Sequence, residues 1–125
     1  NAALEHAGLR VSDIDYINLH GTATPSNDRA EGLAVNTLFG DRTACSSTKG
    51  ITGHTLGAAG AVEAVASCLA LTRGLIPGSP GTRTLDPDIH LNYQMQTSTA
   101  PISRVLSNSF GFGGSNCSLL FGISR

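Results

Sequence analysis

The sequence predicts an α/β fold with a mixed sheet, and two patterns support this prediction. Along the first 71 residues, short segments with the length of a strand alternate with segments of helical periodicity. This order places helices against a largely parallel sheet. The chain then ends in two strand-like segments joined by a glycine-rich loop, which is typical of an antiparallel hairpin. The 125 residues suffice for one domain or part of one.

The first predicted elements are a helix end and a strand. Residues 1–7 are interpreted as the end of a helix that Gly8 closes, because glycine readily takes the left-handed conformation found after helices. Residues 16–20 have the length and composition of a strand. This places His20 at the C-terminal end of that strand.

A second helix and strand follow. Asp28 and Glu31 have the spacing of a capping box, and apolar residues then recur at helical spacing, which predicts a helix over residues 28–39. A short strand is expected at residues 44–47, and a glycine-rich turn at residues 49–57.

The next element, residues 58–71, is a helix with 11 hydrophobic residues out of 14. Its polar exceptions, Glu63 and Ser67, lie four residues apart on one stripe. A helix that is apolar almost all round is buried on nearly every side. We therefore expect it to pack between its own sheet and a layer that is absent from this chain.

The last part of the chain is predicted to be mostly strand and loop. Residues 75–88 contain three prolines and predict an irregular connection. A strand is expected at residues 89–95. Two more strands are expected at residues 104–110 and 117–123, with the glycine-rich loop 111–116 between them.

Composition excludes several classes of protein. Eight Lys and Arg residues against nine Asp and Glu residues give a net charge of −1, so no nucleic-acid or acidic-membrane surface is expected. Three cysteines without paired spacing predict reduced thiols and a cytoplasmic location. The apolar run at residues 64–71 is too short to span a bilayer, so no membrane partner is expected.

Two histidines are candidates for chemistry. His20 and His54 lie at a strand end and before a helix, in segments rich in glycine and threonine, where open α/β sheets place their ligands. The dipole of the following helix favours a neutral His54 ring. His6 and His90 are interpreted as surface residues. Because the sequence has no His-x-x-His or Cys-x-x-Cys spacing, we expect no metal site.

Three motifs resemble the signatures of the C-terminal half of β-ketoacyl-(acyl carrier protein) synthases. They read HGTATPSND at residues 20–28, STKGITGHTLGAAG at residues 47–60 and NSFGFGGSN at residues 108–116. The resemblance runs along essentially the whole chain. It implies a thiolase-like fold, in which two similar α/β halves pack as five alternating αβαβα layers. Residues 1–125 would then be a single partial domain, without the N-terminal half.

The resemblance also implies an activity, the decarboxylative Claisen condensation of fatty acid biosynthesis. In that family a cysteine accepts an acyl group from the phosphopantetheine arm of an acyl carrier protein. Malonyl-carrier then loses carbon dioxide, and its enolate attacks the acyl-enzyme. The implied partners are the acyl carrier protein and a second subunit, in a homodimer or a heterodimer, and no cofactor beyond the carrier's arm is expected.

The resemblance assigns four catalytic residues. His20 and His54 would donate hydrogen bonds to the malonyl thioester oxygen and stabilise its enolate. Lys49 would form a charged pair with Glu31 that orders the site. From its spacing alone, Glu31 could instead simply cap its helix.

The resemblance also assigns residues that contact substrate. Thr22 and Thr24 would bind the pantetheine arm. Phe112 would gate the acyl pocket, and its backbone N–H would supply one donor of the oxyanion hole. Phe110 belongs to the same motif, with packing in the core as its alternative role.

The cysteines need separate treatment because TACSS at residues 43–47 resembles the context of the family's nucleophile. Cys45, however, lies on a predicted strand just before the lysine motif, whereas the family nucleophile opens a helix in the other half. Cys68 and Cys117 are interpreted as small buried hydrophobic residues. The nucleophile is therefore expected outside this chain, which alone would be inactive.

Two alternatives remain open. One is a non-catalytic partner subunit of the chain-length-factor kind, which lacks the nucleophile. The other is a ketosynthase domain of a modular polyketide synthase. Retention of His20, Lys49 and His54 favours a catalytic synthase over the first.

Overall fold

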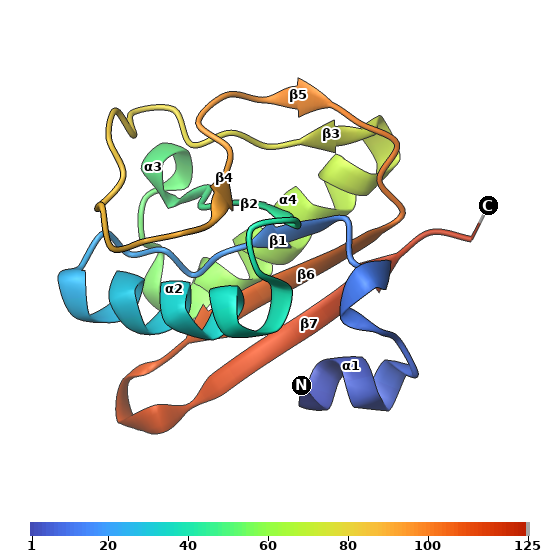
Figure 1. Ribbon diagram of the computed structural model, residues 1–125, viewed down its shortest axis with the longest axis horizontal. Coiled ribbons are helices and arrows are strands. Elements are labelled where there is room, and N and C mark those ends of the chain that lie inside the picture. The colour runs from blue at the N-terminus through green and yellow to red at the C-terminus, as the bar shows by residue number, and fades with distance from the viewer. Residues whose placement is uncertain (125) are drawn as a thin grey trace.

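The computed structural model describes residues 1–124 and has a five-stranded mixed sheet at its centre (Figure 1). In spatial order the strands are β4 (Asn92–Tyr93), β2 (Ala44–Ser46), β1 (Tyr16–Asn18), β6 (Arg104–Phe110) and β7 (Asn116–Gly122). The first four are parallel, and β7 is antiparallel to β6. The predicted α/β class with a mixed sheet is confirmed.

Helices cover both faces of this sheet. Helices α1 (Ala2–Ala7) and α2 (Pro25–Phe39) lie on one face and α4 (Ala59–Arg73) lies on the other (Figure 1). Side chains alternate between the two faces along each strand, so neighbouring residues of β1 enter different cores. Ile17 packs with Phe39 of α2, whereas Tyr16 packs with Leu71 of α4.

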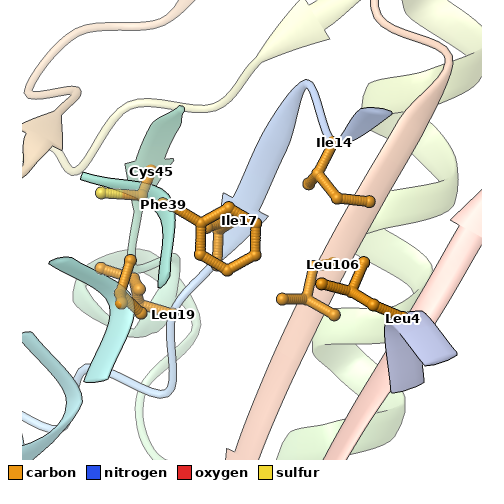
Figure 2. Close-up of a cluster of buried hydrophobic side chains, with 8 residues drawn as sticks. Leu4, Ile14, Ile17, Leu19, Phe39, Cys45 and Leu106 are labelled. Carbon is orange, nitrogen blue, oxygen red and sulfur yellow. The ribbon is translucent and has the colours of Figure 1, made fainter. Parts of the chain in front are cut away.

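The core on the α1–α2 side is apolar and tightly enclosed. Figure 2 shows its side chains converging from the helices and from β1, β2 and β6. Its buried members are Leu4, Ile14, Ile17, Leu19, Val35, Phe39, Cys45 and Leu106. This cluster fixes the sheet beneath the loops that follow β1 and β2.

Parallel pairing aligns the ends of the three central strands. Asn18, near the end of β1, pairs with Ser46 of β2 and with Ser107 of β6. The segments that follow β1, β2 and β6 therefore leave the sheet at one edge. All three motifs found in the sequence begin at or beside this edge.

Helix α2 begins three residues earlier than predicted. Thr24 is its N-cap and Pro25 occupies the first helical position, where the fixed φ of proline fits and its missing N–H is not needed. The expected capping box is wrong, because the Glu31 side chain turns away from the helix toward His20 and Gly21.

Several short elements were not expected. Helix α3 (Lys49–Thr52) and a 3-10 turn (Leu56–Ala58) occupy the predicted glycine-rich turn. Strands β3 (Leu75–Ile76) and β5 (Ser98–Thr99) pair as a separate two-stranded sheet. Elements of two to four residues are too short to show a periodicity in the sequence. The predicted helix end at residues 1–7 and the strand at 104–110 are confirmed.

The polarity of α4 is the reverse of that of an ordinary surface helix. Its polar residues Glu63 and Ser67 are buried, with 1% and 0% of their surface exposed. Its apolar residues Val65 and Leu69 are 60% and 54% exposed. The predicted helix and its apolar composition are confirmed. Burial on nearly every side is not found, because within the described residues the sheet covers only one face.

The same helix is long and apolar by the measures used for membrane spans. The 18 residues Leu56–Arg73 have a mean hydropathy of 1.3, so length and composition would allow a crossing. This segment is longer than the apolar run at residues 64–71. A mostly buried core helix of a soluble protein passes the same test, whereas 28% of this window is buried among the described residues. The Glu63 side chain is buried against the sheet.

Candidate active site

The edge of the sheet where the motifs meet carries a cluster of four predicted residues. His20 follows β1, Lys49 opens α3, His54 follows α3, and Phe110 ends β6. The His20 and His54 rings are edge to face with their centroids 5.5 Å apart. The Phe110 ring lies 5.4 Å from the His20 ring. The structure therefore brings together residues from all three motifs.

His20 is held as a neutral ring. It is buried, and Lys49 Nζ lies 3.2 Å from His20 Nδ1. Desolvation, with the nearby Lys49 charge and His54, lowers the pKa of His20 from 6.5 to about 4. An ammonium group has donors only, so Nδ1 must accept this hydrogen bond. The ring proton is then on Nε2, where it is available to a substrate oxygen.

Lys49 is paired with Glu63, which the sequence analysis did not assign to the site. Both side chains are buried, and Lys49 Nζ donates to Glu63 Oε1. The expected charged pair between Lys49 and Glu31 is wrong. Helix α4 presents Glu63 directly to the start of α3, whereas both oxygens of Glu31 are engaged by backbone.

Glu31 instead holds the loop that carries His20. Its Oε1 accepts the backbone N–H of His20 and its Oε2 accepts that of Gly21, both at 2.9 Å. Asn108 Nδ2 donates to Oε1 at 3.2 Å. Burial raises the pKa of Glu31, and the N–H donors of Gly21 and His20 oppose that rise.

The orientation of His54 is also fixed by backbone. Leu56 N–H donates to His54 Nδ1 at 3.2 Å. Leu56 adopts a left-handed conformation, with φ of 51°, which is rare for a bulky residue. In the neutral ring Nδ1 is therefore an acceptor and Nε2 carries the proton. Both histidines of the cluster thus present an Nε2–H donor.

The predicted substrate-contacting residues lie in the loops that follow β1 and β6 and at the end of β6. Thr22 and Thr24 face each other with their hydroxyl oxygens 2.9 Å apart, across Ala23, whose φ of 62° turns the loop sharply. Phe112 lies in a 3-10 turn after β6 with its side chain fully exposed. Phe110 contacts His20 and is only partly buried, so core packing is not its only role.

A cavity of about 620 Å³ lies on the other side of Glu31, between the start of α2 and the segment 79–93. Glu31 and Gly21 line it, but His20, His54 and Lys49 do not. The cavity is therefore not the space that the histidine pair faces.

The three cysteines differ in exposure. Cys45 is fully buried on β2, and this burial raises its pKa to about 12. Cys68 and Cys117 are exposed, so their interpretation as buried residues is wrong. Cys68 lies on the open face of α4, and Cys117 lies on β7, the edge strand of the sheet.

Thiol labelling should reflect this difference. We expect Cys68 and Cys117 to react with a thiol reagent at pH 8, because they are exposed, and Cys45 to react only after unfolding. Mass spectrometry of the labelled chain gives the result, with a denatured sample as the control. Labelling of Cys45 at the rate of the other two would show a reactive thiol and reopen its interpretation as a nucleophile.

The fold, the order of the motifs and the histidine cluster point to a ketosynthase domain. The sequence profile described as "Beta-ketoacyl synthase, C-terminal domain" matches residues 1–83. This chain belongs to the β-ketoacyl synthase family and corresponds to its C-terminal domain.

Individual relatives agree with this assignment. The chain is 44% identical to the mitochondrial 3-oxoacyl-[acyl-carrier-protein] synthase of Arabidopsis thaliana, over 95% of this chain and 27% of that protein. A chain from the structure of a Xenorhabdus doucetiae ketosynthase in complex with its chain length factor superimposes with a TM-score of 0.92 at 46% identity. A chain from the structure of a type II acyl-carrier protein in complex with its ketosynthase gives 0.93 at 33% identity. These two matches cover 98% and 99% of this chain, and 31% of each matched chain. The chain thus spans less than a third of each relative.

Proposed function

We propose that this chain is the C-terminal part of a 3-oxoacyl-(acyl carrier protein) synthase and provides the decarboxylating side of its active site. The name of the Arabidopsis relative supports this substrate class. The observation that carries the proposal is the neutral His20, whose Nδ1 is occupied by Lys49 and whose Nε2–H is free to donate.

The geometry suits the stabilisation of an enolate. The two Nε2–H donors of His20 and His54 would bind the thioester oxygen of malonyl-carrier. When the bond between the α-carbon and the carboxylate breaks, carbon dioxide leaves. The electron pair of that bond stays with the thioester part and forms the enolate, which carries negative charge on the thioester oxygen. Fixed donors aimed at developing charge stabilise such a transition state. The enolate carbon then attacks the acyl thioester, forming the new carbon–carbon bond and releasing the cysteine thiolate.

The proposal needs groups outside this chain. The acyl-accepting cysteine would come from an N-terminal half, since Cys45 is buried on β2 and its burial raises the pKa of its thiol. Substrates would arrive on the phosphopantetheine arm of an acyl carrier protein, as the similar ketosynthase solved with its carrier suggests. Thr22 and Thr24 would contact that arm, and Phe112 would gate the acyl pocket. The apolar side of α4 would pack against the N-terminal half.

The test is a condensation assay on the intact synthase that contains this chain. We expect 3-oxoacyl-carrier to form from acyl-carrier and malonyl-carrier, with carbon dioxide released in equal amount. A folded protein that binds malonyl-carrier but never releases carbon dioxide would contradict the proposal. That outcome would instead support a non-catalytic partner subunit.

The low pKa of His20 predicts an unusual pH dependence. Between pH 6.5 and about 4 the unfolded chain binds a proton at this histidine that the folded chain does not bind. The free energy of unfolding should therefore fall as the pH is lowered through this window, and level off below it. NMR titration of the His20 ring should give a midpoint near 4. A midpoint near 6.5 would show that the ring is not held neutral.

A further inference from the structure

Just before its last residue, strand β6 carries two consecutive polar residues that point to opposite faces of the sheet. Asn108 contacts Glu31 on the α2 face, and Ser109 contacts Glu63 on the α4 face. We propose that Asn108 and Ser109 are positioning residues that fix His20 from both sides, Asn108 through the backbone of the His20 loop and Ser109 through the His20 ring. For its effect on catalysis, this inference rests on the proposed function.

The path through Asn108 leads to the backbone of His20. Ser118 of β7 donates its hydroxyl to Asn108 Oδ1 at 2.8 Å, which turns the Nδ2 donor of the amide toward Glu31. The Glu31 carboxylate can only accept hydrogen bonds, so it needs the Nδ2 donor of Asn108 rather than its Oδ1. The orientation that Ser118 imposes on the Asn108 amide meets this need. Glu31 in turn accepts the N–H groups of His20 and Gly21. Asn108 thus completes the support of the loop.

The path through Ser109 leads to the His20 ring. Ser109 Oγ donates to Glu63 Oε2 at 3.2 Å, and Glu63 Oε1 accepts from Lys49. Lys49 in turn donates to His20 Nδ1. Gly60 makes room for the serine, because a Cβ there would come within 3.2 Å of Ser109 Oγ. The Ser109 hydroxyl therefore packs closely between α4 and β6.

Losing the Ser109 hydroxyl should change the hydrogen bonding of the His20 ring without removing any charged group. Glu63 Oε2 would have no donor from Ser109 in a buried site, so the carboxylate could turn and share both oxygens with Lys49. The ammonium would then no longer be aimed at His20 Nδ1. Donors that act on a transition state must be held to well under an ångström, and such precision depends on supporting hydrogen bonds.

The test uses the intact synthase with Ser109→Ala and Asn108→Ala. We expect each to slow decarboxylation of malonyl-carrier about tenfold, the scale of one hydrogen bond to a charged group, while acylation stays within about twofold. Ser109→Thr keeps the hydroxyl and should restore the rate. Ser67→Ala is the matched control, because Ser67 carries a buried hydroxyl on α4 that donates to the backbone carbonyl of Glu63 rather than to its carboxylate.

A second readout does not depend on activity. In Ser109→Ala the Lys49 charge should move away from His20 Nδ1, so the NMR titration midpoint of the His20 ring should rise, while Ser67→Ala should leave it unchanged. An unchanged midpoint, or equal loss of both half-reactions, would overturn the positioning role. If the wild-type synthase releases no carbon dioxide, the proposed function fails, and the midpoint still decides the role of Ser109.

Discussion

Replacement of either His20 or His54 by alanine in the intact synthase is expected to slow decarboxylation of malonyl-carrier about 10² to 10³-fold, the usual effect of losing one donor aimed at a developing oxyanion. Each variant removes an Nε2–H that matters only when negative charge appears on the thioester oxygen. Under the proposed function, acyl transfer to the cysteine would rely on other N–H donors, including that of Phe112, and should largely survive. The expected enzyme still becomes acylated but hardly decarboxylates.

Separate assays of the two half-reactions test this expectation. Acylation is followed by mass spectrometry of the covalent adduct, and decarboxylation by release of carbon dioxide. His90→Ala is the matched control, because His90 is exposed and lies outside the cluster. If His54→Ala abolished acylation while decarboxylation stayed at the wild-type rate, the assigned role would be wrong.

Removing the carboxylate of Glu63 should have the largest effect on stability. Glu63→Ala leaves the buried Lys49 ammonium without its partner. Breaking a buried ion pair from one side destabilises a protein by about 3–5 kcal/mol, a large part of the stability of a typical domain. Denaturant unfolding of the variant should show this loss, whereas Glu5→Ala, on the exposed side of α1, should lie within about 0.5 kcal/mol of wild type.

A double variant shows whether the stability loss in Glu63→Ala comes from the broken Lys49–Glu63 ion pair or from lost side-chain packing. Replacing Lys49 by methionine in the Glu63→Ala background removes the unpaired charge, so much of the lost stability should return. If Glu63→Ala were as stable as wild type, Lys49 would have another partner, and the pairing seen in the structure would be wrong.

Most of the fold could be predicted from the sequence, because long elements carry periodic patterns and their ends carry glycine or proline. His20 and His54 were predicted to lie where open α/β sheets bind their ligands, and both are found at the edge where the parallel strands end. The arrival of the third motif at the same edge was not predicted. The partner of Lys49 was missed. Glu63 and Ser67 looked like the polar stripe of an apolar helix, but that stripe faces the sheet.

A physical signal for Glu63 was present in the sequence. A helix expected to be buried on nearly every side could hold a carboxylate only if a cation met it, and Lys49 was the lysine of the neighbouring motif. Glu31 could not be assigned in the same way. It accepts hydrogen bonds from backbone N–H groups ten and eleven residues earlier in the chain and from the amide of Asn108. A loop conformation of this kind leaves no pattern in the sequence.

The reversed polarity of α4 changes how this helix could be redesigned. An ordinary amphipathic helix is made more soluble by leaving its apolar stripe alone and adding charge beside its polar residues. Here Glu63 must stay untouched, because it forms the buried ion pair with Lys49. Charged residues at Val65 and Leu69, on the open apolar side, would make this chain alone more soluble, but they would oppose the packing against an N-terminal half that the proposed function requires. A designer who follows the hydropathy pattern alone would modify the wrong side of the helix.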